Sequence, residues 1–504
     1  MLRRKIFSNQ FQVLFFTTLA IVLLINAVPS FWRFSAQAMT GSHQGHSHLE
    51  QYQVSTHNPI IVIPGLLGSA LGNPQQEPVW GQLSFTSDFT QLALPMSSKL
   101  TLNSVEMVAG QVLPSLKANV FGLRFEQEVY RRMLNALGAD GEYQNATTQL
   151  NKIDDRNEPI TCFQFPYDWR QDNVKNAQRL HTFILKKRDD LRQKYQERYG
   201  IDNPDIKFDI VAHSMGGLLT RYFLRYGDRD LPENGELPQV TWEGARYIDR
   251  VILIAPPNAG SINDFVNLAY GTFTNFPNFF SEPVGALGVL AGRLGIGPAN
   301  LNSNMAVLST FPSLYQMLPR NRHKPVIIVG SDGSRTTADL FKVEVWEKMQ
   351  WGIFAPKADS TLKRLLPEVS SFSDRHRIAR NMMVQNLRRA EQFTQALDQP
   401  AQLPSNLNLQ LLAGNSVLTA QTIEVNQSGQ FKVIKTTPGD GTVTRASATL
   451  DERTDEDGML KLQSPIPWSQ TNFYPQDHLK LVQNSSLIDS LRCTLLGKPG
   501  IVES

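Results

Sequence analysis

Residues 209–219 read Asp-Ile-Val-Ala-His-Ser-Met-Gly-Gly-Leu-Leu, and this stretch decides the fold. Its first half is mainly apolar and predicts a strand entering a buried sheet, while the residues after Ser214 have the spacing of a helix. Small residues flank the serine in the pattern small-x-Ser-x-small, which is typical of a tight strand-to-helix turn that presents a nucleophile. Such a turn lifts the Ser214 hydroxyl above the sheet and places the Met215 amide at a helix N-terminus, where an oxyanion is stabilised. A strand-turn-helix with a chance serine is the alternative interpretation.

Strand-like and helix-like segments alternate on both sides of this stretch. Strands are predicted at residues 59–63, 161–165, 207–212, 247–255 and 407–414, and helices at 121–137, 173–199 and 218–225. This alternation predicts an α/β fold with a mostly parallel sheet covered by helices on both faces. Residues 264–400 contain mainly helical patterns, which predicts a cap inserted between two strands of the sheet. The whole domain is expected to span residues 58–495.

Residues 72–98 lack regular periodicity and contain Trp80, Phe85 and Phe89 among prolines, glycines and hydroxyl residues. Long loops of this kind often form lids over a binding site. Because few charges accompany the three rings, we predict a lid loop that docks on a lipid or membrane surface. The alternative is that the rings pack beneath the cap and stabilise the fold.

A second turn follows the strand at residues 59–63 and reads Pro-Gly-Leu-Leu-Gly-Ser at residues 64–69. Its glycines let the backbone approach a substrate closely. In a fold with a nucleophile at a strand-to-helix turn, the loop after an early strand supplies a second oxyanion donor. The Leu66 amide is the candidate for this donor, and a tight turn without a chemical role is the alternative.

A nucleophilic serine needs a base to accept its proton and an acid to orient that base. Asp440 lies in a Gly-Asp-Gly turn after a strand-like run, and His478 is the only histidine that follows it. We therefore predict Asp440 as the acid and His478 as the base. Asp332 also follows a strand-like run and His376 lies downstream of it, so this pair is the alternative. His213 is predicted to form structural hydrogen bonds.

Five short motifs together resemble the lecithin:cholesterol acyltransferase family of α/β-hydrolases, which includes lysosomal phospholipases, phospholipid:diacylglycerol acyltransferases and bacterial relatives. They occur in the family's order at residues 64–69, 165–170 (Phe-Pro-Tyr-Asp-Trp-Arg), 213–217, 439–443 and 478. The resemblance implies Ser214, Asp440 and His478 as the catalytic triad. It also implies the backbone amides of Leu66 and Met215 as the oxyanion hole.

The chain departs from the family pattern at two places. Leu66 stands where some members have an acidic residue, and no cysteine between residues 71 and 100 is available for the family's paired-cysteine lid. Because an oxyanion hole needs only a backbone N–H, the first departure leaves catalysis intact.

The motifs together predict a serine esterase of the lipase or phospholipase type, which cleaves lipid acyl esters through an acyl-enzyme. An O-acyltransferase results if an alcohol replaces water as the acceptor of the acyl group. Two further alternatives are a peptidase or thioesterase on the same fold and a lipid-binding protein without turnover. Neither a metal nor an organic cofactor is implied. The expected partner is a lipid at a membrane or aggregate surface, and protein partners are not indicated.

The N-terminus predicts export. A basic start, an apolar run over residues 13–28 and Ala-Gln-Ala at residues 36–38 are typical of a secretory signal peptide that comprises residues 1–38. An uncleaved membrane anchor is the alternative, and either one places the bulk of the chain outside the cytoplasm. Residues 39–57 contain several histidines and are expected to form a flexible linker.

Composition and charge fit an exported globular enzyme. Of 504 residues, 41% are hydrophobic and 19% are charged. The formal net charge is +3, and removing the four positive charges of residues 1–38 leaves −1, which gives no electrostatic case for binding nucleic acid. The two cysteines, Cys162 and Cys493, are too far apart in sequence for a zinc motif. Export permits a disulfide between them, but two separately buried thiols are expected.

Overall fold

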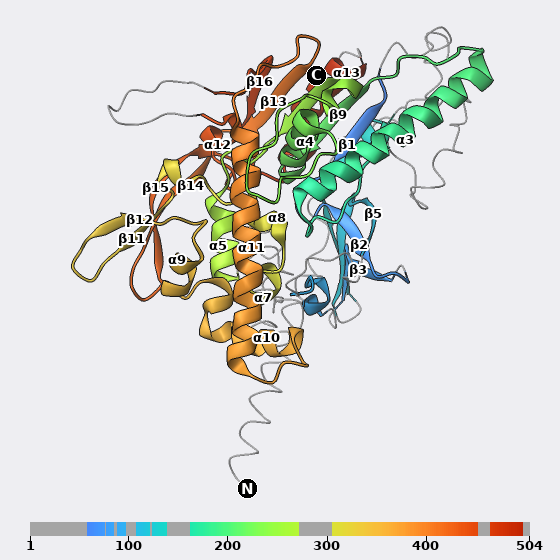
Figure 1. The fold of residues 1–504 in the computed structure, drawn as a ribbon. Helices are drawn as coiled ribbons and strands as arrows, with labels where there is room; N and C mark the ends of the chain where they lie inside the picture. Colours follow the sequence, from blue (N-terminus) through green and yellow to red (C-terminus); the bar gives the residue numbers. More distant parts are fainter. Residues whose placement is uncertain are drawn as a thin grey trace, which may run out of the picture. The chain divides into compact units, whose positions relative to one another are not determined.

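The computed structural model describes residues 58–75, 77–84, 88–96, 107–120, 123–138, 162–271, 305–451 and 464–496. These residues are built around a sheet of six parallel strands in the order β16-β13-β10-β9-β1-β8 (Figure 1). The strands are β1 (Ile60–Ile63), β8 (Cys162–Gln164), β9 (Phe208–His213), β10 (Ile248–Ile254), β13 (Asn408–Gly414) and β16 (Gln470–Tyr474). The predicted α/β fold with a mainly parallel sheet is confirmed.

Helices cover both faces of the central sheet. The α-helices of the described chain are α2 (Arg131–Ala136), α3 (Asn173–Tyr199), α4 (Met215–Tyr226), α5 (Ile262–Tyr270), α7 (Met305–Leu308), α8 (Pro312–Tyr315), α9 (Val343–Lys348), α10 (Asp359–Leu365), α11 (Phe372–Asp398), α12 (Arg445–Thr449) and α13 (Ser485–Leu496). Leu253 of β10 points toward α4, since a Cβ atom added to Gly217 would lie 3.7 Å from Leu253 Cδ2. The preceding residue, Ile252, lines a cavity together with Leu491 of α13. Successive side chains of a strand point to opposite faces, so α4 and α13 lie on opposite sides of the sheet.

The described residues also form three smaller sheets. Their strand orders are β3-β2-β5, β4-β6-β7 and β12-β11-β14-β15. The bounds are β2 (Ser69–Gly72), β3 (Pro78–Trp80), β4 (Gln82–Ser84), β5 (Val108–Val112), β6 (Ser115–Val120), β7 (Leu123–Glu128), β11 (Val326–Val329), β12 (Arg335–Thr337), β14 (Val417–Val425) and β15 (Phe431–Gly439). The last of these strands ends directly before Asp440, so the four-stranded sheet delivers the predicted acid to the edge of the central sheet.

The helix predicted at residues 121–137 is wrong in its first half. β7 pairs antiparallel with β6, from Leu123 opposite Val120 to Glu128 opposite Ser115. Only the short helix α2 follows. The prediction rested on an apolar residue at every fourth position, but a spacing of four also keeps side chains on one face of a strand. Pairing with β6, which lies outside residues 121–137, decides between the two.

The lid predicted at residues 72–98 is wrong for two of its three aromatic residues. This segment contains β3, β4 and the 3₁₀ helix η1 (Phe89–Leu92). Trp80 and Phe89 are only 4% and 5% exposed, so neither ring is available to a lipid surface. The Trp80 ring packs edge-on against Trp169, with ring centroids 5.6 Å apart, because the strand turns it toward the core. Phe85 lies outside the described residues.

The chain between β10 and β13 is mainly helical and forms the insertion between these two strands. It holds α5, α7 to α11, and the 3₁₀ helices η5 (Asn321–His323), η6 (Gly352–Phe354) and η7 (Pro356–Ala358). The long helix α11 ends against α4 (Figure 1). Arg221 Nη2 donates to the Leu397 carbonyl and Tyr226 Oη to the Ala396 carbonyl, both at 2.8 Å. These bonds tie the insertion to the helix that begins after Ser214.

The structure tests the prediction about the two cysteines but not the predictions about the N-terminus. Cys162 is buried and Cys493 is exposed, and no disulfide joins them, so the expectation of a buried thiol is wrong for Cys493. Among the helices named above, none combines the length and the hydrophobicity needed to cross a membrane. The predicted signal peptide or anchor and the linker lie outside the described residues.

Candidate active site

Ser214 lies in a strained turn between β9 and α4. Its backbone has φ of 53° and ψ of −126°, a conformation that non-glycine residues rarely adopt. The turn is possible because its neighbours are small. A Cβ atom at Gly216 would collide with the Pro64 carbonyl, and one at Gly217 would lie 2.8 Å from Pro256 Cβ. The Ser214 amide donates to the Ile254 carbonyl at 2.8 Å, which ties the turn to the end of β10.

His478 and Asp440 complete a hydrogen-bonded series with this serine. His478 Nε2 lies 2.9 Å from Ser214 Oγ, and His478 Nδ1 lies 2.7 Å from Asp440 Oδ2. All three side chains are at least nine-tenths buried. The structure therefore brings together the serine, base and acid that the sequence predicted, from chain positions up to 264 residues apart.

The turn that carries Asp440, here called the acid turn (residues 439–444), is closed in part by hydrogen bonds to its own backbone. Asp440 Oδ1 accepts hydrogen bonds from the amides of Thr442 at 2.9 Å and Val443 at 2.6 Å. The remaining oxygen is thereby directed at His478. The His478 amide in turn donates to the Asp440 carbonyl at 2.9 Å, so acid and base are joined through main chain as well as side chains.

The surroundings of His478 favour the protonated, positively charged form of its ring. Burial alone lowers the pKa of this imidazole, but the charge of Asp440 and the hydrogen bond that His478 donates to it outweigh burial, and the pKa is raised above its ordinary value. Asp264 and Asp477 contribute in the same direction to a smaller extent. The carboxylates therefore stabilise the imidazolium that forms when a base takes a serine proton.

The turn at residues 64–69, here called the oxyanion turn, is held by four aromatic side chains. Tyr167 Oη donates to the Pro64 carbonyl at 2.9 Å, and Trp80 Nε1 donates to the Leu67 carbonyl at 2.8 Å. Trp169 Nε1 donates to the Ser69 carbonyl at 3.1 Å, and Tyr130 Oη accepts from the Gly65 amide at 2.9 Å. The turn's own backbone bond uses the amide of Gly68. None of these bonds uses the Leu66 amide, the predicted oxyanion donor.

The predicted oxyanion donors lie on the two turns that meet at Ser214. Met215 is the first residue of α4, where an amide has no intrahelical acceptor. The oxyanion turn approaches the serine from the other side, since a Cβ atom at Gly65 would lie 2.8 Å from Ser214 Cβ. This close approach requires glycine at position 65 and brings the backbone at Leu66 to the nucleophile.

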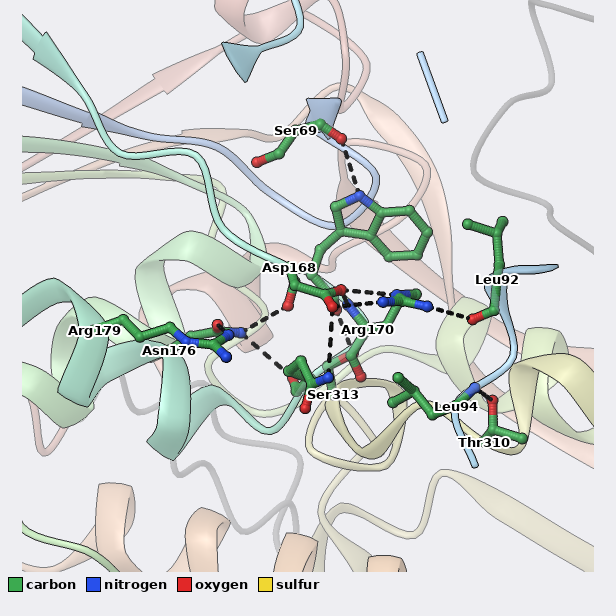
Figure 2. A network of polar contacts seen from close by, with 11 residues as sticks. Ser69, Leu92, Leu94, Asp168, Arg170, Asn176, Arg179, Thr310 and Ser313 are labelled. Carbon is green, nitrogen blue, oxygen red and sulfur yellow. Dashed lines mark hydrogen bonds and ion pairs between the residues drawn. The ribbon is translucent and has the colours of Figure 1, made fainter. Parts of the chain in front are cut away.

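The Phe-Pro-Tyr-Asp-Trp-Arg motif at residues 165–170 supports this turn through a buried ion pair (Figure 2). Asp168 receives two hydrogen bonds from the Arg170 guanidinium, from Nε at 2.8 Å and from Nη2 at 2.6 Å. Arg170 Nη1 also donates to the Leu92 carbonyl at 2.9 Å, and Ser313 Oγ donates to the Trp169 carbonyl at 2.6 Å. The motif therefore joins the oxyanion turn, the η1 segment and helix α8 into one rigid support.

A small cavity lies beside the serine. Its wall includes Ser214, His478 and the oxyanion turn, together with Tyr130 and His213. The other lining side chains are apolar: Trp80, Leu113, Leu116, Val129 and Leu479. Such walls suit contact with an apolar group, because burying apolar surface is favourable at about 25 cal/mol per Å².

The alternative acid and base do not meet. Asp332 is exposed, and its carboxylate accepts from the Ser334 amide at 3.0 Å. His376 lies near the start of α11, with Nε2 3.5 Å from Asp359 Oδ1 and its ring against Phe372. Neither contacts the other or Ser214. Among the described residues, no group of three or more His, Cys, Asp or Glu side chains is placed to hold a metal ion.

Sequence reasoning missed the residues that hold the oxyanion turn. Tyr167 and Trp169 were visible as parts of a family motif, but the pattern did not indicate that their side chains bond to residues 64–69. Trp80, which the sequence predicts to dock on lipid, instead donates to the Leu67 carbonyl. Tyr130 gave no signal at all, because it lies 65 residues from Gly65 and in a segment that was interpreted as a helix interior.

Comparison with known proteins agrees with the motifs. The family model of lecithin:cholesterol acyltransferase matches residues 141–351, a segment that includes the 165–170 motif and the turn at Ser214. The resemblance predicted from the motifs is therefore confirmed. Together with the fold, this match makes the chain an acyl-ester hydrolase or an acyltransferase. No curated protein sequence matches the chain.

Comparison with solved structures finds similarity at low identity. The chain is similar to the structure of the Tle4–Tli4 complex, with 13% identity and a TM-score of 0.50, covering 88% of this chain and 100% of that one. It is also similar to the lipase BlEst2 of Bacillus licheniformis in its propeptide form, with 12% identity and a TM-score of 0.30, covering 89% and 52% of the two chains. For EstA from Clostridium botulinum the values are 12% and 0.29, with 86% and 85% covered.

Proposed function

We propose that the protein is an exported serine esterase that cleaves lipid acyl esters through an acyl-enzyme. The observation that carries this proposal is the hydrogen-bonded series from Ser214 through His478 to Asp440, with links of 2.9 and 2.7 Å. The family match supports an acyl ester as the substrate, and the apolar wall beside the serine supports an apolar acyl group. Because long-chain esters are scarce as free monomers, the enzyme would meet its substrate at a membrane or aggregate surface.

In this mechanism Ser214 Oγ attacks the ester carbonyl while His478 Nε2 accepts its proton. The amides of Leu66 and Met215 stabilise the oxyanion, and Asp440 stabilises the imidazolium. His478 then gives the proton to the leaving alcohol, and the ester bond to that alcohol breaks. Water, deprotonated by the same imidazole, attacks the acyl-enzyme, releases the fatty acid and restores the serine.

Acyl transfer to an alcohol is the second candidate, because the matching family model is that of an acyltransferase. An alcohol that reaches the acyl-enzyme before water would be acylated by the same steps. Product analysis with a phospholipid labelled in its acyl chain separates the two. Free labelled fatty acid indicates hydrolysis, and a labelled ester of an added lipid alcohol indicates transfer. If neither product forms, the proposed substrate class is wrong.

The first prediction concerns the nucleophile. Ser214→Ala should abolish ester turnover without unfolding the protein, because alanine is smaller than serine and fits the same turn. A fluorophosphonate probe should label the wild type at this residue alone. Mass spectrometry of the labelled peptide locates the probe, and a thermal melt checks the fold. Turnover by the alanine variant, or labelling at another residue, rejects Ser214 as the nucleophile.

Export is the part of the proposal that rests on the N-terminal sequence. N-terminal sequencing of the protein from its native host would distinguish the two expected forms. A chain that begins after residue 38 supports a cleaved signal peptide, and an intact chain in the membrane fraction supports an anchor. An intact chain in the cytoplasmic fraction rejects export.

A further inference from the structure

A second series of hydrogen bonds starts at the oxyanion turn and is not used by the mechanism above. The Gly65 amide donates to Tyr130 Oη at 2.9 Å, and Tyr130 Oη lies 2.8 Å from His213 Nδ1. On the other side of the ring, His213 Nε2 lies 3.2 Å from the His478 carbonyl oxygen. All of these groups are buried. The series thus connects the turn of the predicted oxyanion donor to the main chain of the predicted base.

The chemistry of the groups fixes the direction of each bond. The His478 carbonyl can only accept, so His213 Nε2 must carry a proton. Burial, and then the nearby His478, hold the pKa of His213 well below its ordinary value, so the ring is neutral and Nδ1 is an acceptor. Tyr130 must therefore donate its O–H to Nδ1. Burial raises the pKa of this phenol, which keeps the proton in place.

We propose that Tyr130 and His213 are positioning residues, which fix the Leu66 amide relative to His478 and Ser214. This inference rests on the proposed function, because it assigns the Leu66 amide a role in that reaction. Gly65 lies against both Ser214 and His213, since a Cβ atom there would lie 2.8 Å from Ser214 Cβ and 3.3 Å from His213 Nδ1. Tyr130 Oη accepts the hydrogen bond from the amide of the same glycine. The position of the oxyanion donor is therefore coupled to the position of the base.

Tyr130→Phe removes the central link of this series. Both the Gly65 amide and His213 Nδ1 then lose their hydrogen-bond partner inside the protein. The oxyanion turn keeps only three of its four hydrogen bonds to aromatic side chains. A displacement of about 1 Å in an active site can cost ~100-fold in rate. We therefore expect kcat to fall by about 10- to 100-fold while KM changes by less than about twofold, because the donor acts on the transition state.

The experiment compares kcat and KM of the full-length wild type, Tyr130→Phe and a matched control on a soluble short-chain ester. Tyr315→Phe is the control, because Tyr315 is also fully buried and its hydroxyl donates to the Ser309 carbonyl at 2.8 Å. The control should lower the melting temperature as much as Tyr130→Phe but leave kcat unchanged. Equal losses of kcat in both variants, or an unchanged kcat in Tyr130→Phe, would overturn the positioning role.

A second measurement tests the series without turnover. In ¹⁵N-histidine spectra of the wild type, His213 should remain the neutral Nε2–H tautomer at every pH at which the protein is folded, with its signal assigned by His213→Gln. An Nδ1–H tautomer, or titration of this ring near neutral pH, contradicts the proposal even if Tyr130→Phe fails to fold. A wild type that hydrolyses no ester overturns the proposed function instead, so the two failures are distinguishable.

Discussion

Two aspartates follow strands of the same four-stranded sheet, and their surroundings differ. Asp440 follows β15 and is 2% exposed; one carboxylate oxygen contacts His478 and the other accepts two backbone amides. Asp332 follows β11 and is exposed, and its carboxylate accepts from the Ser334 amide. Both lie in turns that contain glycine. The local sequences are therefore alike, and what packs against each turn is not.

Three distant segments hold the acid turn in place. The side chain of Asn263, from the start of α5, donates to the Gly441 carbonyl at 2.9 Å. Thr419 Oγ1, from β14, accepts from the Gly441 amide at 2.8 Å. Gly414, at the end of β13, packs directly beneath Asp440. The turn at Asp332 contacts its own hairpin. Contacts from elements far away in the chain thus hold the Asp440 carboxylate where it can bond to a base.

The largest effect should come from replacing each aspartate by asparagine, which removes its negative charge. Asp440→Asn should lower kcat by roughly 10⁴-fold, as the loss of the acid does in another triad, because an amide cannot hold the required histidine tautomer. Asp332→Asn should change kcat by less than about twofold, since the side chain is exposed and makes no contact with the site. Hydrolysis of a soluble ester measures both. The reverse ranking would move the acid to Asp332.

The sequence was most informative where one short segment carries the whole constraint. The turn at Ser214 needs small residues next to a strand and a helix, so its position could be predicted from adjacent residues. Asp440 and His478 followed from chain order and from the chemistry that a serine requires. The choice of Asp440 over Asp332 rested on the single later histidine and on family resemblance, since the two turns themselves look alike.

Contacts between distant segments could not be predicted in the same way. The residues of β7 fit a helical pattern because the partner that makes them a strand, β6, lies outside residues 121–137. Trp80 looked like a surface ring because its acceptor, the Leu67 carbonyl, is 13 residues away in another turn. Tyr130 reaches His213 across 83 residues. Single-sequence patterns describe neighbours along the chain, whereas these side chains are defined by neighbours in space.

A smaller effect should come from adding one methyl group beneath each aspartate. A Cβ atom at Gly414 would lie 2.6 Å from Asp440 Cβ and 2.8 Å from the Gln476 carbonyl, and neither can move without displacing the site. Gly414→Ala should therefore destabilise the fold by ~1–3 kcal/mol. It should also lower kcat by roughly 10- to 100-fold, because the acid is displaced.

Gly330→Ala is the matched change beneath Asp332. There the added atom meets only the side chains of Ser334 and Asp332, which are exposed and can rotate away. The free energy of unfolding should change by less than about 0.5 kcal/mol, and kcat should stay the same. Chemical denaturation and ester hydrolysis measure the pair of variants. Similar costs at both glycines would mean that the acid turn is no more tightly packed than the exposed one.

The smallest effect concerns the pH at which activity appears. His478 acts as a base only when neutral, and its pKa is raised above 6.5, so kcat/KM should fall as the pH drops through a value above 6.5. Asp477 is one of the carboxylates that raise this pKa, but it is partly exposed and paired with Lys480. Asp477→Asn removes its negative charge, makes the imidazolium less stable and lowers the pKa of His478. The acid limb should therefore move to lower pH, by only a few tenths of a unit because exposed charges are screened by solvent and salt.

Asparagine can still accept from the Lys480 amide, which donates to Asp477 Oδ1 at 2.9 Å, so the loop should keep its shape. Asp332→Asn should leave the limb where it is. A limb that moves upward in Asp477→Asn, or moves equally in both variants, would show that the carboxylates around His478 do not set its pKa.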